Sequence, residues 1–215
     1  MPRAALFDVL GTLFSLEPLQ RKLRAAALDA WFERLLHSAT SLTLAGQFEP
    51  FADLAESTLK TTIAKLGLKT DPKAVLDALA QLPPDVGAEA AFEQLERAKL
   101  LIGVLTNAGE NETRQLLDAA GLAERVDELV SAEEVELYKP HPAVYRHAAE
   151  RLGVEPKSIT LISAHAWDVV GAKAAGLDTI WVDRLEREWP FPRGKPRSRI
   201  AHDLGEAADL VAAKR

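Results

Sequence analysis

Apolar and polar positions follow two patterns along this chain of 215 residues, and each predicts one kind of element. Short apolar runs bounded by glycine and polar residues predict buried strands. Longer segments in which apolar residues recur every three or four positions predict helices. The predicted strands cover residues 4–7, 100–106, 128–131, 159–163 and 179–182. The helices between and after them cover residues 88–98, 110–120, 142–152, 167–176 and 204–213. Such alternation favours an α/β fold with a parallel sheet flanked by helices.

A long segment without strand pattern separates the first predicted strand from the second. Its predicted helices cover residues 18–40, 50–66 and about 72–82, the last beginning at a cap formed by Asp71 and Pro72. We therefore predict a core domain made of residues 1–14 and 86–215, with a helical cap subdomain at 15–85. Because this insertion starts beside the end of the first strand, it is well placed to act as a lid. The alternative is that it only covers one end of the sheet.

The first strand delivers a carboxylate into a loop, because Asp8 follows the apolar run 4–7 and Gly11 and Thr12 then predict a turn. Open α/β sheets build their active sites at the carboxyl ends of their strands. Asp8 is therefore the first candidate for a catalytic residue. Two positions further on stands Leu10, which has no proton to donate, and this limits the chemistry at the site.

Composition narrows the classes of function. The net charge is −6 and no basic stripe is present, so we expect no nucleic-acid partner. The absence of cysteine excludes disulfides, thiolate metal sites and a cysteine nucleophile. No run of about 18 apolar residues occurs and no apolar signal segment precedes the first strand, so we expect a cytoplasmic protein without membrane contact. Residues 188–199, rich in proline and basic side chains, predict an exposed loop.

Three later loops bring further polar residues to the same predicted edge of the sheet. They contain Thr106 and Asn107, then Lys139, and finally the group Ser163, His165 and Asp168. Each alone has an ordinary explanation: Thr-Asn is a common helix cap and a single lysine is usually solvated. Because their loops lie at one edge of the predicted sheet, these residues are candidates for a common site.

Together these residues resemble the haloacid dehalogenase superfamily of hydrolases, through Asp8-x-x-Gly11-Thr12, Thr106-Asn107, Lys139-Pro140-His141-Pro142 and a distal Asp168. The resemblance is greatest to the L-2-haloacid dehalogenase branch. That branch is similar at Tyr138 through Pro142, at Ser163 through Lys173, and in having a helical cap after the first strand. The resemblance implies a Rossmann-like core.

Within this resemblance the residue types suggest their roles. Asp8 is the predicted nucleophile, which forms an ester intermediate. The positive charge of Lys139 would keep Asp8 ionised. Thr12 and Thr106 could fix the oxygens of the leaving group or of the substrate carboxylate by hydrogen bonds. Asp168 would pair with Lys139 and orient water.

The remaining polar candidates have supporting roles. Ser163 would add a hydroxyl group to the network around Asp8 and Lys139, and Asn107 is predicted to position other groups rather than to carry a proton. We expect no cofactor. Mg²⁺ belongs only to a phosphatase alternative.

Two positions distinguish the branches. Phosphatases of the superfamily resemble Asp-x-Asp-Gly-Thr, and their second Asp protonates the leaving oxygen, whereas this chain has Leu10 there. Those phosphatases also have an acid, where this chain has Ser163, that helps to hold Mg²⁺. Both changes favour displacement at carbon, because a halide leaves without a proton.

The chain also departs from the dehalogenase branch. That branch has Tyr at Leu10 and Asn at His165, and its cap arginine occurs as Trp-Leu-Arg. Here the matching segment is Trp31-Phe32-Glu33-Arg34, one residue longer. Arg34 is the candidate for binding halide or carboxylate, with a surface arginine as the alternative. Trp31 and Phe32 are candidates for lining the pocket, with core packing as the alternative.

Three functions therefore remain to be distinguished. The first is a metal-independent hydrolase that displaces halide from a small 2-halocarboxylate through an aspartyl ester. The second is a phosphatase with an atypical general acid, and the third is a ligand-binding protein that keeps the fold but not the catalysis. The expected partner is a small-molecule substrate. The sequence leaves the oligomeric state open, a homodimer included.

Overall fold

The computed structural model describes residues 2–196 and 199–213, and it contains one parallel sheet covered by helices on both faces. Residues 197 and 198 of the predicted 188–199 loop lie outside the described residues. The strands are β1 (Ala4–Asp8), β2 (Leu101–Thr106), β3 (Glu128–Ser131), β4 (Ile159–Ser163), β5 (Asp178–Val182) and β6 (Ile200–Ala201). Their order is β3-β2-β1-β4-β5-β6, and all pairs are parallel. The predicted α/β fold class is confirmed.

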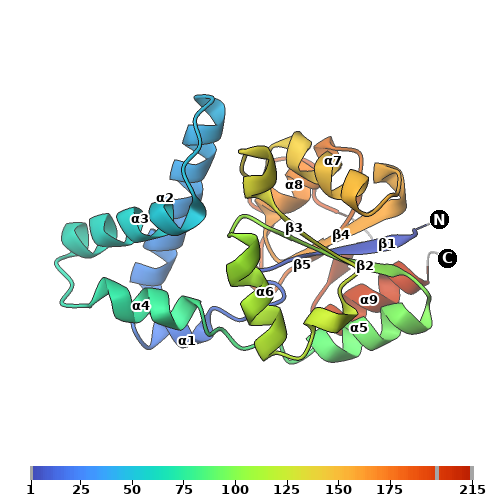
Figure 1. Ribbon diagram of the computed structural model, residues 1–215, viewed down its shortest axis with the longest axis horizontal. Helices are drawn as coiled ribbons and strands as arrows, with labels where there is room; N and C mark the ends of the chain where they lie inside the picture. The colour runs from blue at the N-terminus through green and yellow to red at the C-terminus, as the bar shows by residue number, and fades with distance from the viewer. Residues whose placement is uncertain (1, 197–198, 214–215) are drawn as a thin grey trace.

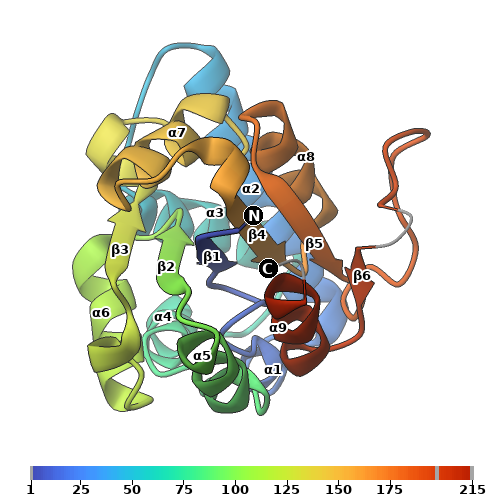
Figure 2. The same ribbon diagram turned by 90° about the vertical axis from the view of Figure 1, so that its right-hand side faces the viewer.

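Alternate residues of the central strand β1 enter different hydrophobic clusters. Ala5 and Phe7 belong to one cluster, whereas Ala4 and Leu6 belong to the other. A strand that is buried on both faces has no polar face, which explains the continuous apolar run in the sequence. Figure 2 shows the result: α7 (Pro142–Arg151) and α8 (Ala166–Ala174) lie on one side of the sheet, and α5 (Ala88–Arg97) and α9 (Leu204–Ala212) on the other.

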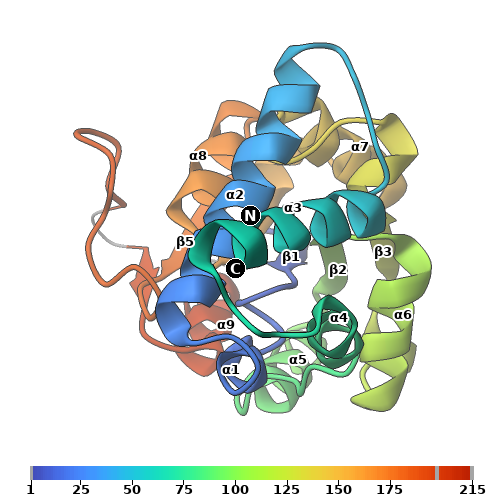
Figure 3. The same ribbon diagram turned by 90° about the vertical axis from the view of Figure 1, so that its left-hand side faces the viewer.

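The helical insertion forms a group of its own beside the carboxyl ends of the strands (Figures 1 and 3). Its helices are α1 (Glu17–Gln20), α2 (Ala25–Leu44), α3 (Phe51–Leu66) and α4 (Pro72–Leu79). The Asp71 side chain accepts a hydrogen bond from the Lys73 backbone, with Pro72 at the start of α4, as the sequence predicts. None of the described helices is long and apolar enough to cross a membrane.

One predicted helix is wrong. The segment 18–40 contains two helices, α1 and α2, separated at residues 21–24. Arg24 has an extended backbone (ψ 149°), although no Gly or Pro interrupts the run, while Leu19 and Leu23 before it are buried. Burial of these leucines outweighs local helix propensity here, because propensities differ by less than about 1 kcal/mol per residue.

The other differences are small. Helix α6 (Glu110–Ala119) and most helix and strand ends lie within three residues of the prediction. The sequence did not predict β6, because two residues are too few to produce a pattern, nor the short 3₁₀ helices. These are η1 (Ala123–Arg125), η2 (Ala132–Val135) and η3 (Pro156–Ser158). None of these differences moves the strand ends that carry the candidate residues.

Candidate active site

The carboxyl ends of β1, β2 and β4 meet at one edge of the sheet. Asp8 ends β1, Thr106 ends β2 and Ser163 ends β4. The strand order changes direction at this point, since β1 is followed on one side by β2 and on the other by β4. Such switch points are where open α/β sheets bind their ligands. Lys139 reaches the same edge from the segment between η2 and α7.

Lys139 lies between two carboxylates in the interior of the protein. Its Nζ donates to Asp8 Oδ1 at 2.6 Å and to Asp168 Oδ2 at 3.1 Å, and it also donates to the Leu105 carbonyl oxygen at 3.2 Å. The lysine side chain is 1% exposed and that of Asp168 is 0% exposed. A buried charge is stable only when it is paired and hydrogen-bonded, and this arrangement pairs all three charges.

The electrostatics favour an ionised Asp8. Burial alone would raise the pKa of Asp8, but the positive charges of Lys139 and His165 and the hydrogen bonds from Lys139 and Thr12 outweigh it. The pKa therefore lies below its ordinary value of 3.8. Burial raises the pKa of Asp168, and the nearby charge of Asp8 adds to this, although Lys139 opposes it. The pKa values of the two carboxylates are thus shifted in opposite directions, downward for Asp8 and upward for Asp168.

Two hydroxyl groups fix the other oxygen of Asp8. Thr12 Oγ1 donates to Asp8 Oδ2 at 2.6 Å and accepts from the Ala164 N–H at 2.9 Å. Ser163 Oγ donates to the same Asp8 oxygen at 3.3 Å. The predicted role of Thr12 in contacting substrate does not fit, because Thr12 is fully buried and its hydroxyl proton is used on Asp8 itself. Thr12 therefore orients the candidate nucleophile.

Thr106 and Asn107 both line a small cavity beside Asp8. The side-chain oxygen of each accepts a hydrogen bond from a backbone N–H group of the protein. Thr106 Oγ1 accepts from the Ala108 N–H at 3.0 Å and so closes a turn before α6. It does not form the helix cap that the sequence left as an alternative, because the N-cap of α6 is Gly109 and has no side-chain hydrogen bond. Asn107 Oδ1 accepts from the backbone N–H of Lys139 at 2.8 Å. This bond holds the residue that carries the lysine side chain, and the positioning role of Asn107 in the reaction stays a prediction.

His165 approaches Asp8 from the start of α8. Its Nε2 lies 3.9 Å from Asp8 Oδ2 and 2.8 Å from the Leu10 carbonyl oxygen. Because a carbonyl oxygen only accepts, Nε2 carries a proton. Gly11 makes this approach feasible: its φ is +82°, and a Cβ atom there would lie 3.0 Å from His165 Nε2.

A small cavity of about 20 Å³ opens beside Asp8. The His165 ring, which lines it, stacks with those of Phe32 and Trp167, at centroid distances of 5.7 and 5.3 Å. The lining residues are Asp8, Leu10, Phe32, Leu36, Phe51, Thr106, Asn107, Lys139, His165 and Trp167. Leu10, Phe32, Thr106, Asn107 and His165 are thus brought to the cavity as the sequence suggested. Leu36, Phe51 and Trp167 were not predicted, because the pattern of apolar residues on a helix is the same whether these residues pack in a core or line a pocket.

The structure does not bring Arg34 and Trp31 to this cavity. Arg34 Nε donates to Thr62 Oγ1 on α3 at 3.2 Å. Trp31 is buried between α2 and α3, where its Nε1 donates to the Ala55 carbonyl oxygen at 3.2 Å. Phe32 faces the cavity instead. Since successive residues of a helix are about 100° apart, Arg34 lies about 200° around α2 from Phe32.

Tyr145, which was not predicted either, supports Asp168. Its hydroxyl donates to Asp168 Oδ1 at 2.6 Å, and the residue is fully buried. Gly171 permits this contact, because a Cβ atom there would lie 2.6 Å from the Tyr145 hydroxyl oxygen. Tyr145 stands on the buried face of α7, so its position alone indicated only core packing.

Replacement of Tyr145 by Phe tests this support. We expect Tyr145→Phe to lower the free energy of unfolding by about 1–3 kcal/mol, because a buried carboxylate loses a hydrogen-bond donor. Urea denaturation measures it. The matched control is Tyr138→Phe, whose hydroxyl donates to the Glu49 carbonyl oxygen in a partly exposed position. If the free energy of unfolding falls equally in both variants, the hydrogen bond to Asp168 stabilises the protein no more than the bond to Glu49 does.

The donor set for a metal ion is poor. Among the described residues, no group of three or more His, Cys, Asp or Glu side chains is arranged to hold one. Asp8 and Asp168 are the two acids of the site, and the Lys139 ammonium group already bridges them. Ser163 supplies a hydroxyl where a third carboxylate would be needed.

This fold and this aspartate–lysine–aspartate site define the chain as a member of the haloacid dehalogenase-like hydrolases, whose family model matches residues 2–176. The chain is 30% identical over 219 residues to (S)-2-haloacid dehalogenase 1 from Pseudomonas sp. (strain CBS-3), which covers 97% of this chain and 96% of that protein. It is also 30% identical to (S)-2-haloacid dehalogenase 4A from Burkholderia cepacia, with 98% and 95% covered. A crystal structure of a dehalogenase with an intermediate complex superimposes with a TM-score of 0.87 at 27% identity, covering 98% and 97% of the two chains.

Proposed function

We propose that this protein is a hydrolase of the 2-haloacid dehalogenase type, which cleaves the carbon–halogen bond of 2-halocarboxylates. The observation that carries this proposal is the Lys139 ammonium group between Asp8 and Asp168, together with Leu10 where a proton donor would otherwise stand. An anionic carboxylate is then available as a nucleophile, but no acid two residues on can protonate a leaving oxygen. Halide needs no proton to leave. The naming of two relatives as (S)-2-haloacid dehalogenases supports the same chemistry.

In the first step, one carboxylate oxygen of Asp8 attacks the carbon that bears the halogen. A carbon–oxygen bond forms while the carbon–halogen bond breaks, and the halide leaves with the electron pair. Thr12 and Ser163 hold the carboxylate in one orientation, which lowers the entropy lost on reaching the transition state. Asn107 keeps the backbone of Lys139 in place. The product of this step is an ester between Asp8 and the substrate.

In the second step, water adds to the carboxyl carbon of Asp8. The bond between this carbon and the ester oxygen then breaks, and the departing oxygen takes the remaining proton of the water to give the 2-hydroxy acid. While water adds, negative charge develops on the carbonyl oxygen of the ester, within reach of the Lys139 ammonium group, which stabilises it. Asp168, held by Tyr145 and Lys139, orients the water and accepts its proton. The raised pKa of Asp168 suits a group that takes up a proton and returns it to solvent.

His165 lines the cavity together with the polar residues Thr106, Asn107 and Lys139. We assign it to the substrate carboxylate or the departing halide, either of which would replace the Leu10 carbonyl oxygen as the partner of the Nε2–H group. It occupies the cavity wall next to Asp8, and the cation expected from the helical insertion, Arg34, bonds to Thr62 instead. The apolar remainder of the wall, with Phe32 and Leu10, excludes water from the reacting carbon.

We further infer that residues 15–85 are a cap subdomain over the core formed by 1–14 and 86–215. Two hydrogen bonds support this: the Tyr138 hydroxyl donates to the Glu49 carbonyl oxygen, and the Phe51 N–H donates to Glu133 Oε1. Phe51 also lines the cavity at Asp8, so movement of the insertion would open this cavity to substrate.

A panel of 2-halo acids, assayed for halide release with and without a chelator, tests the proposed function. We expect turnover of (S)-2-halo acids that a chelator leaves unchanged, because the site offers two carboxylates and a lysine rather than a metal-binding set. The same preparation is assayed with an aryl phosphate and Mg²⁺. Phosphate release without halide release would show that the protein is a phosphatase instead.

A further inference from the structure

The small cavity at Asp8 is too small for a substrate. Its volume of about 20 Å³ is close to the space that one water molecule occupies. Even the smallest 2-halo acid needs more room than this. Substrate binding therefore requires a continuation of the cavity or a movement of its walls.

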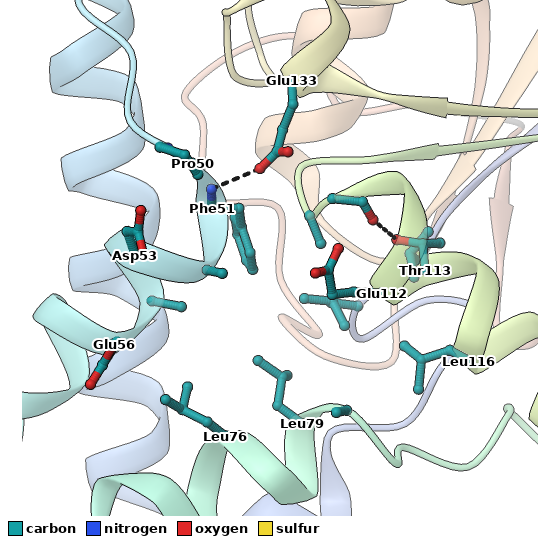
Figure 4. Close-up of a pocket in the computed structure, with 17 residues that line it drawn as sticks. Pro50, Phe51, Asp53, Glu56, Leu76, Leu79, Glu112, Thr113, Leu116 and Glu133 are labelled. Atoms are coloured by element: carbon teal, nitrogen blue, oxygen red, sulfur yellow. Dashed lines mark hydrogen bonds between the residues drawn. The ribbon is translucent and has the colours of Figure 1, made fainter.

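A second, larger cavity adjoins the first (Figure 4). Its volume is about 330 Å³, which is within the range of small-molecule binding sites. It lies between helices α3 and α4 of the insertion and the start of α6 in the core. Leu10 and Phe51 line both cavities and therefore stand between them. Joining the two spaces requires a movement of the half-buried Leu10 side chain, of Phe51, or of both.

The lining of the larger cavity indicates the kind of group that fits. Leu76 and Leu79 project toward it from α4, and Leu116 projects toward it from α6 (Figure 4). No Lys, Arg or His side chain is among its lining residues, whereas Asp53, Glu56, Glu112 and Glu133 are. These carboxylates repel a second anion. The substrate carboxylate consequently stays near Lys139 and His165, and the leucines favour an apolar group for the part of the substrate that extends into the larger space.

We propose that the larger cavity binds the hydrocarbon tail of the substrate, so that the protein prefers 2-halo acids with long alkyl chains over halopropionates. This inference rests on the proposed function of Asp8. The reacting end occupies the space around Asp8, and the chain passes Leu10 and Phe51 to reach the leucines of α4 and α6. Leu10 has no polar group that would oppose the passage of an alkyl chain.

The first test is the dependence of kcat/KM on chain length, measured with 2-bromopropionate, 2-bromobutyrate, 2-bromohexanoate and 2-bromooctanoate. We expect kcat/KM to rise about threefold to fourfold for each methylene group that the cavity buries. Constant or falling kcat/KM with chain length overturns the proposal.

The second test places a charge in the cavity. Leu79→Asp is expected to lower the ratio of kcat/KM for 2-bromooctanoate over 2-bromopropionate at least about tenfold, because the tail then meets a carboxylate. The matched control is Leu66→Asp, at an exposed position of α3 that does not line the cavity, and it should leave the ratio unchanged. Equal ratios in the two variants contradict the assignment of the cavity.

Binding without turnover separates this inference from the proposed function. Calorimetry with unhalogenated acetate, hexanoate and octanoate reports on the cavity whether or not the protein dehalogenates anything. Octanoate that binds more tightly than acetate, and loses this advantage in Leu79→Asp, supports the tail cavity. Equal affinities overturn it. Absence of bromide release from every acid of the series would overturn the proposed function alone.

Discussion

Replacing Asp8 by Asn is expected to reduce halide release at least about 10⁴-fold, because an amide cannot displace halide from carbon. The effect should appear in kcat, since the nucleophile is lost while the walls of the cavity remain. The variant should still fold, because Asn can accept a hydrogen bond from Lys139 as Asp8 Oδ1 does. Initial rates of halide release, with circular dichroism to verify folding, measure this result.

The matched control is Asp118→Asn, which removes the same charge from an exposed position on α6. Its rate should equal that of the unaltered protein. If Asp8→Asn keeps a tenth or more of the activity, Asp8 is not the nucleophile, and the reaction proceeds by direct attack of water.

Lys139→Met is the second variant with a large expected effect, about 10³-fold on kcat/KM. The sign of its pH dependence follows from the site. With the lysine present, the pKa of Asp8 lies below 3.8, so Asp8 is ionised throughout the neutral range and limits activity only in more acid solution. Without the ammonium group, burial raises the pKa of Asp8. The residual activity should then increase as pH rises from 4 toward neutrality, as the carboxyl group becomes ionised.

Rates between pH 4 and pH 9 distinguish this electrostatic role from a general loss of structure. Lys173→Met, at an exposed position of α8, serves as the control and should retain both the rate and the pH profile. A Lys139→Met profile of unchanged shape would contradict the claim that the lysine sets the ionisation of Asp8.

The positions of Asp8 and Ser163 could be predicted from the sequence because parallel strands impose them. A residue at the carboxyl end of a buried parallel strand lies at the edge of the sheet that all these strand ends share. The apolar runs before Asp8 and Ser163 are unambiguous, and the observed strands end at these residues. Local pattern and three-dimensional position are therefore directly linked in the core.

The same reasoning failed on the insertion. Arg34 and Phe32 are two residues apart on α2, and which of them faces Asp8 depends on how α2 packs against α3. That packing is set by buried residues such as Trp31, whose indole group bonds to Ala55 and Thr58 on the other helix. No local signal gives the rotation of a helix about its axis, since an amphipathic helix fits its neighbours in more than one phase.

The larger cavity could not be predicted from the sequence either. Its walls come from α3, α4 and α6, and each of its leucines is ordinary in a helix that packs against a core. Only the arrangement of the three helices leaves space between Leu76, Leu79 and Leu116. In contrast, Leu10 could be singled out from the sequence, because it stands in the motif that contains Asp8. The structure adds that this residue lies between the two cavities.

The most direct test of the central claim is a single turnover in ¹⁸O-labelled water, followed by mass spectrometry of the peptide that contains Asp8. Attack of water on the carboxyl carbon of the aspartyl ester places the label in Asp8, while the first molecule of hydroxy acid carries an unlabelled oxygen from the enzyme. We expect that result. Label in the product, with Asp8 unlabelled, would contradict the covalent mechanism.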